Sequence, residues 1–173
     1  MMLSPQNQKL TELKGILSQE IQSYEALEKM MTHKKALLIA GKAEELSRLD
    51  QDLLRITQKV TELEQKRMTL LVQMGHQNQT LHEFIRTLDI QDSRNFMEAR
   101  QRLVRVVDNV KTLNETNRTL LDLSLKWIES SVEVIASLLV PEGASYTQKG
   151  GKPQGKQQGT VTTMISSTIE HSA

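Results

Sequence analysis

Cysteine is absent from this 173-residue chain, aromatic residues make up 3% of it, and no proline lies between Pro5 and Pro141. Without cysteine the chain has no disulfide bond and no thiolate chemistry, as is common in a reducing compartment. A β-rich or α/β domain of this size normally carries turn prolines and aromatic strands, so the composition predicts an all-α protein. No run of about 18 apolar residues is present, and we expect no membrane-spanning helix.

The charges of the chain favour neither nucleic acid nor an acidic membrane as partner, because the formal net charge is +1. Residues 1–5 lack the basic start and apolar run of a signal peptide, so we expect a cytoplasmic protein. We interpret one basic cluster as a solvated helix face, because basic clusters that bind nucleic acid normally accompany a basic domain. The cluster comprises Arg94, Arg100, Arg102 and Arg105. An RNA-binding adaptor is an alternative, which steeply salt-dependent binding would reveal.

Neither a catalytic nor a metal site is predicted. The four histidines, His33, His76, His82 and His171, show no metal-ligand spacing. The glycines fall mainly at inferred turns and near the C-terminus, so they form no phosphate-cradling loop. We therefore expect a protein that is not an enzyme and needs no cofactor or metal.

Heptad spacing of apolar residues predicts two helices of similar length. The first begins with Ser4 as its N-cap and Pro5 at its first position, and it extends to about Leu38. Residues 40–42, Ala-Gly-Lys, provide the break, and the second helix carries its heptad over residues 46–74 before Gly75. An antiparallel helical hairpin follows from this pattern.

A longer helix follows, after a short amphipathic segment that carries Leu81, Phe84, Ile85 and Leu88 on one side. Asp89 or Asp92 is the expected N-cap of this last helix, which ends at Pro141. We therefore predict a coiled-coil-like three-helix bundle over residues 1–140. Residues 141–173 are rich in Gly, Ser, Thr, Gln and Lys and cannot bury a core, so we expect a flexible, disordered C-terminal tail.

The last helix is apolar on two neighbouring stripes, of which the second appears only near its end. The first stripe follows three-four spacing through Phe96, Ala99, Leu103, Val106, Val110, Leu113, Asn117, Leu120, Ser124, Trp127, Ser131, Val134 and Leu138. The second stripe comprises Leu121, Leu125, Ile128, Val132, Ile135 and Leu139. One stripe is enough to join a bundle, so two indicate an additional buried surface.

Helix lengths place this double stripe beyond the hairpin. The first two helices are each about 50 Å long and the last is about 70 Å, so its end is expected to overhang from near Trp127. Three interpretations stay open: a partner binds there, the segment around Phe84 folds over the surface, or two copies pair through it. Trp127 is accordingly either a core residue or a partner contact.

Polar residues also occur on the apolar faces through which the helices are expected to pack. In an antiparallel hairpin turning near Gly41, Glu20 lies opposite about Glu62, one turn from Arg67. We hypothesise an interhelical Glu20–Arg67 ion pair that fixes the register of the hairpin. Asn117 could serve the same purpose in the last helix, and a solvated edge position is the alternative for all three residues.

Several groups of residues resemble the FlgN family of flagellar export chaperones in their order and spacing. These are Glu20-x-x-x-Tyr24-x-x-Leu27, the turn sequence of residues 36–46, Leu63-Glu64-x-x-Arg67, Asn114-Glu115-x-Asn117-x-x-Leu120-Leu121-x-x-Ser124-Leu125, and Tyr146-x-x-x-Gly150. The resemblance covers about Leu10 to Gly150 and includes the shared plan of helices followed by a loose tail.

The resemblance implies a cytosolic, non-enzymatic chaperone that binds the C-terminal region of flagellar hook-associated proteins and delivers them to the export gate. Its substrate-binding part would be the end of the last helix and the tail, which on this chain points to Leu121, Leu125, Ile128, Val132, Ile135 and Leu139. Trp127, beside them, is added as a candidate partner contact. The family's tail tyrosine would be Tyr146, implicated in docking to the export gate; Thr147 follows it here, where the family often has Asp or Gly. A homo-oligomeric coiled-coil scaffold that self-associates through the second stripe is the alternative function.

Overall fold

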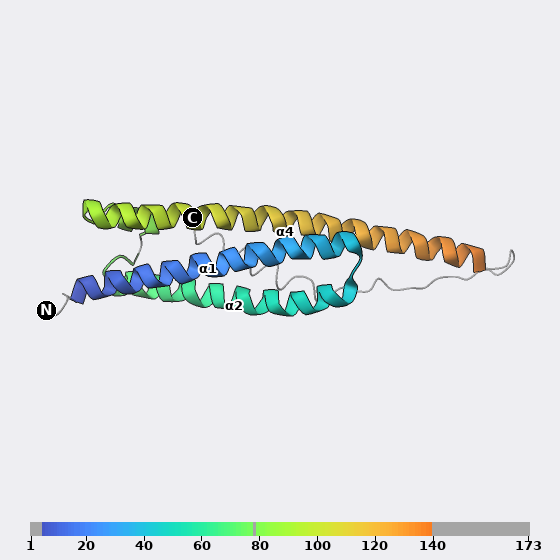
Figure 1. Ribbon diagram of the computed structural model, residues 1–173, viewed down its shortest axis with the longest axis horizontal. Coiled ribbons are helices and arrows are strands. Elements are labelled where there is room, and N and C mark those ends of the chain that lie inside the picture. Colours follow the sequence, from blue (N-terminus) through green and yellow to red (C-terminus); the bar gives the residue numbers. More distant parts are fainter. Residues whose placement is uncertain (1–4, 78, 140–173) are drawn as a thin grey trace.

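The computed structural model describes residues 5–77 and 79–139, in which the regular secondary structure is helical and turns connect the helices (Figure 1). They are α1 (Pro5–Ala40), α2 (Ala43–Gln73), α3 (Leu81–Ile85) and α4 (Ile90–Leu139). This confirms the prediction of an all-α fold in which an antiparallel hairpin is followed by a long helix. None of the described helices is long and apolar enough to cross a membrane. The expected flexible tail lies outside the described residues.

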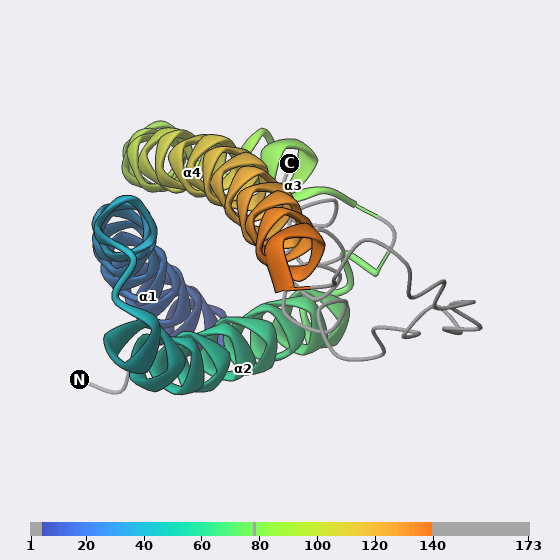
Figure 2. The ribbon, with the colours of Figure 1, turned by 90° about the vertical axis from the view of Figure 1, so that its right-hand side faces the viewer.

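Helix α1 lies between the other two long helices and packs against both (Figure 2). It forms the hairpin with α2, and α4 runs parallel to it, as shown by a Lys14–Asp92 ion pair near one end and an Asn117–Met31 hydrogen bond near the other. Among the described residues, the backbones of α2 and α4 do not approach each other closely. The three long helices are thus joined through α1.

Glycines lie in the turns that end α1 and α2. Gly41 and Gly75 adopt positive φ angles of 67° and 89°, where a residue with a Cβ would be strained, and each ends a helix. Of the two candidate caps for α4, Asp89 is the one used, because its Oδ1 accepts a hydrogen bond from the Asp92 backbone N–H at 2.8 Å. Ser4, the expected cap of α1, lies outside the described residues.

The short helix α3 packs at the start of α4 rather than at its end. A capping box between Thr80 and Glu83 starts the helix, and the rings of Phe84 and Phe96 meet edge to face with centroids 6.0 Å apart. The interpretation that this segment folds over the second stripe is therefore wrong. The segment between α2 and α4 crosses only one end of the bundle. At that end the first stripe of α4, which begins at Phe96, already provides an apolar surface.

One continuous apolar core runs along α1, between this helix and its two neighbours α2 and α4. Its fully buried members include Leu13, Leu17, Tyr24, Leu27 and Met31 of α1, Leu53 and Val60 of α2, and Phe96, Leu103 and Val110 of α4. Within each long helix these residues recur at three- and four-residue intervals or their sums, so the three-four spacing identifies the packed faces correctly.

The hypothesised Glu20–Arg67 ion pair is present inside this core. Arg67 Nε donates a hydrogen bond to Glu20 Oε1 at 3.1 Å, and the two side chains are 4% and 0% exposed. The hydroxyl of Tyr24 donates to Glu64 Oε1 at 3.1 Å, so a second carboxylate lies close by. Burial raises the pKa of Glu20 to about 7, although the charge and hydrogen bond of Arg67 oppose this.

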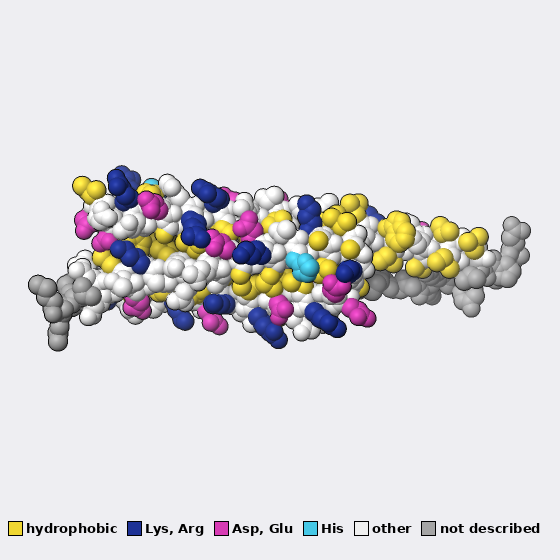
Figure 3. All heavy atoms as spheres, in the orientation of Figure 1, with side chains coloured by type: hydrophobic (Ala, Val, Ile, Leu, Met, Phe, Trp, Pro, Cys, Tyr) yellow, Lys and Arg dark blue, Asp and Glu magenta, His cyan; other side chains and the backbone are white. Residues whose placement is uncertain are grey.

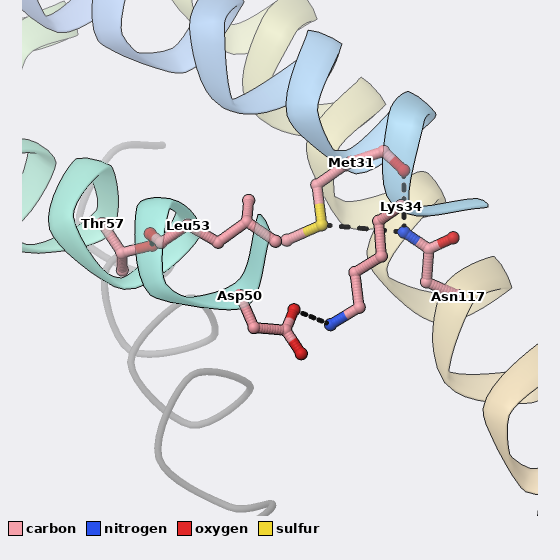
Figure 4. Close-up of polar contacts among 6 residues, drawn as sticks. All are labelled: Met31, Lys34, Asp50, Leu53, Thr57 and Asn117. Atoms are coloured by element: carbon pink, nitrogen blue, oxygen red, sulfur yellow. Dashed lines mark hydrogen bonds and ion pairs between the residues drawn. The ribbon is translucent and has the colours of Figure 1, made fainter. Parts of the chain in front are cut away.

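Asn117 forms the corresponding polar link between α1 and α4. Its Nδ2 donates to the Met31 carbonyl oxygen at 2.9 Å, and it lies 3.7 Å from Met31 Sδ (Figure 4). On the α2 side of the same region, Lys34 forms an ion pair with Asp50 at 2.7 Å. Glu20, Arg67 and Asn117 are all buried, so the alternative of solvated edge positions is wrong for each.

We predict that the stability of the fold falls as pH rises through about 7. Between the usual pKa of Glu20, 4.5, and its folded pKa of about 7, the folded chain holds a proton that the unfolded chain releases. The free energy of unfolding should therefore be roughly 1–3 kcal/mol higher near pH 5 than near pH 8. Urea unfolding across this range measures it, and Glu20→Gln should flatten the profile. An equally steep profile in Glu20→Gln would assign the titration to another group.

Gly15 offers a test of the helix itself. It lies within α1, and no neighbouring atom of the fold lies within 4 Å of the place a Cβ would occupy. Gly15→Ala should raise the free energy of unfolding by about 0.5–1 kcal/mol, because alanine restricts the unfolded chain without a clash. Gly41→Ala, at φ 67°, is the matched control and should destabilise. A loss of stability in Gly15→Ala would show that the fold requires glycine at this position.

Candidate functional site

The end of α4 projects beyond the hairpin (Figure 1). The first stripe is buried against α1 as far as Asn117, half-buried at Leu120 and Ser124, and 73% exposed at Trp127. The structure therefore agrees with the expectation that the overhang starts near Trp127. This geometry follows from length, because α1 has 36 residues and the parallel α4 has 50.

Large apolar side chains gather on this projecting end (Figure 3). Among the described residues, eight of the twelve exposed large hydrophobic side chains lie here: Leu123, Leu125, Trp127, Ile128, Val132, Val134, Ile135 and Leu138. The remaining four, Ile39, Met68, Val72 and Ile90, are spread over three helices. We call the eight side chains together the α4 patch. A concentration of this kind marks an interaction surface, whereas single exposed apolar residues do not.

The predicted site residues fall into three groups. Leu125, Trp127, Ile128, Val132 and Ile135 belong to the α4 patch, with exposed fractions between 40% and 73%. Leu121 is half-buried at the base of the patch. Leu139 is the last residue of α4, and its side chain, like Tyr146, lies outside the described part.

The interpretation of Trp127 as a core residue of this chain is wrong. Its side chain is the second most exposed of the α4 patch, after Leu138. No bundle helix reaches it, because α1 ends at Ala40 and Met31 already lies level with Asn117. Within the described part of the chain the indole is therefore exposed.

Leu123, Val134 and Leu138 are members of the patch that sequence reasoning did not assign to the site. Val134 and Leu138 belong to the first stripe, whose end was expected to overhang, but of that stripe only Trp127 was assigned to the site. The signal was the length difference, which removes α1 from the last turns of that stripe. Leu123 lies on neither stripe, but it precedes Trp127 by four residues, and that helical spacing was the signal for it.

Serine hydroxyls at the projecting end of α4 form hydrogen bonds within the helix. The hydroxyls of Ser124 and Ser131 donate to the carbonyl oxygens four residues earlier, at 2.9 and 2.8 Å. They therefore need no partner outside the helix. No group of His, Cys, Asp or Glu that could hold a metal occurs within the described ranges. The surface can thus bind another apolar surface, by burial of side chains rather than by directed polar contacts.

An all-α fold whose described residues leave one helix end apolar and exposed defines a class of helical protein with a concentrated exposed apolar surface. Within that class, the chain belongs to the FlgN family: the family model described as FlgN protein matches residues 1–154. Membership supports a general role as a flagellar export chaperone, and the family is one of chaperones rather than enzymes. No curated protein and no solved structure matches the chain.

Proposed function

We propose that this protein is a cytoplasmic export chaperone that binds the C-terminal helical region of flagellar hook-associated proteins through the end of α4. By covering that region it prevents premature assembly, and it then delivers the subunit to the flagellar export gate. The observation that supports this assignment is the α4 patch, an apolar surface concentrated where the family resemblance expects the client to bind.

A client that polymerises through amphipathic helices must hide its apolar face before export, and helix-on-helix packing can provide this cover. Burial of about six aliphatic side chains, at roughly 1.5–3 kcal/mol each, contributes about 9–18 kcal/mol before costs. Ordering a disordered client costs about 2–5 kcal/mol, and association entropy costs at least about 4 kcal/mol. In the upper part of this range about 8 kcal/mol remains, which corresponds to roughly micromolar binding and suits a carrier that must release its cargo.

The alternative function is a homo-oligomeric coiled-coil scaffold, and the same patch could support it by pairing two copies. The two functions differ in oligomeric state without a client. A chaperone can be a monomer that exposes the patch, whereas a scaffold is a stable oligomer that dilution does not dissociate. Sedimentation over a hundredfold range of concentration separates them.

Co-purification tests the chaperone function directly. The tagged full-length chain is expected to retain hook-associated subunits from a lysate of the flagellated source cells, identified by mass spectrometry. A variant with Leu125, Ile128 and Val132 replaced by serine should lose them. Recovery of the chain alone, together with a concentration-insensitive oligomer, would favour the scaffold and overturn the proposal.

Tyr146 is proposed to dock the loaded chaperone to the export gate. Since it lies 19 residues beyond Trp127 in the sequence, Tyr146→Ala should leave client affinity within about twofold while reducing secretion of hook-associated subunits and motility. Tyr146→Phe is the control that keeps the ring. Normal motility of the Tyr146→Ala strain would count against docking through this residue, and loss of client binding would move the residue to the client site.

A further inference from the structure

The apolar surface at the end of α4 is wider than one helix contact. At 100° per residue, the apolar side chains from Leu121 to Leu138 occupy an arc of about 200° around the helix. Leu123 and Val134 mark one edge of this arc, and Leu125 and Val132 mark the other. The projecting part of the first stripe and the second stripe are centred about 120° apart within it.

A single partner helix covers about half of that arc, because the apolar face through which a helix packs is about 100° wide. A single helix centred on the arc would lie over Ser124 and Ser131, whose hydroxyls are bonded within α4. It would leave both edges in water, although Val132 and Val134 are each nearly 60% exposed and available for burial.

From this width we propose that the α4 end holds two amphipathic helices of one partner at the same time, one on each stripe. The inference rests on the proposed function and specifies its client: a segment that folds back as a helical hairpin rather than a single helix. The first helix lies beyond the end of α1, over Trp127, Val134 and Leu138. The second helix lies on the flank, over Leu125 and Val132.

The charges on the rest of the helix favour such a partner over a second copy of this chain. Residues 121–139 carry three acidic side chains and one basic one, a net charge of −2. Asp122 and Glu129 are exposed and border the second stripe on the helical wheel. Two copies paired antiparallel through this stripe would bring these carboxylates together, which is unfavourable, whereas a client helix with lysine or arginine beside its apolar face is attracted.

The test compares two edge variants of the full-length chain by calorimetric titration with the C-terminal segment of a co-purified hook-associated subunit. Leu123→Ser/Val134→Ser alters the first edge, and Leu125→Ser/Val132→Ser alters the second. Lys126→Ser/Glu133→Ser, on the opposite face and without a change of net charge, is the matched control. All six positions are exposed, so helicity should be unchanged. Each edge variant should weaken binding about 10-fold or more, and the control less than about threefold.

The outcomes separate the two proposals. If one edge variant binds as tightly as the unmodified chain, a single helix is the ligand and the two-helix inference is overturned, while the proposed function stands. If a peptide of either client helix alone binds as tightly as the hairpin segment, the inference is overturned in the same way. If the unmodified chain binds no hook-associated subunit, the proposed function fails and the inference fails with it.

Discussion

Replacing Leu125, Ile128 and Val132 together with serine should abolish binding of hook-associated subunits while leaving the fold intact. The three side chains are 40%, 52% and 59% exposed in the free protein, so little of the bundle's stability depends on them. Their contribution to the complex, at roughly 1.5–3 kcal/mol each, corresponds to a loss in affinity of about a thousandfold or more. Titration calorimetry measures the affinity, and circular dichroism measures the helicity and melting temperature.

Lys126→Ser/Glu133→Ser provides the control for this variant, because both residues lie on the polar side of the same turns. The control should bind the client normally. A fall of more than about 10 °C in the melting temperature of the triple variant would place Leu125, Ile128 and Val132 in the core and contradict the account. Normal client binding by the triple variant would contradict it equally.

Arg67→Ala should produce the largest loss of stability of any single change discussed. The substitution leaves the fully buried Glu20 without its cationic partner, and removing one member of a buried ion pair costs about 3–5 kcal/mol. The remaining carboxylate can escape part of this cost by taking up a proton, so the loss should be larger at pH 8 than at pH 5. Urea unfolding at both pH values measures it.

The double variant Glu20→Leu/Arg67→Leu is the matched comparison for Arg67→Ala. Replacing both charges with apolar groups should recover most of the lost stability, because an unpaired buried charge no longer remains. If the pair also sets the register of α1 against α2, this variant should form alternative oligomers in sedimentation. If the double variant is stable and keeps the oligomeric state of the unmodified chain, the ion pair does not set the register. A loss of less than about 1 kcal/mol in the free energy of unfolding of Arg67→Ala would contradict the buried ion pair itself.

The sequence predicted the bundle well because one physical rule governs it. Apolar residues at three-four spacing must be buried, and Leu13, Val60 and Val110 lie where that rule places them. The Glu20–Arg67 pair was also predictable, since an antiparallel hairpin turning at Gly41 fixes which residues face one another. Local rules of this kind need only the positions of residues along a helix.

Features that depend on how whole elements are placed were harder to predict. The position of α3 depends on the turn after Gly75 and the cap at Thr80, and neither is visible in the spacing of Phe84 and its neighbours. The overhang expected from near Trp127 exposes Val134 and Leu138, but their spacing is that of a buried seam, so spacing alone did not assign them to the site. For the same reason, the width of the α4 patch follows from the structure rather than from either stripe alone.

The central claim is that the end of α4 binds hook-associated subunits, and one titration tests it most directly. The purified full-length chain is titrated with the C-terminal segment of a hook-associated protein from the same cells, in a calorimeter. The account predicts saturable binding near micromolar Kd or tighter, with a negative heat-capacity change because apolar surface is buried. No heat of binding at about 100 µM of either component would contradict the account.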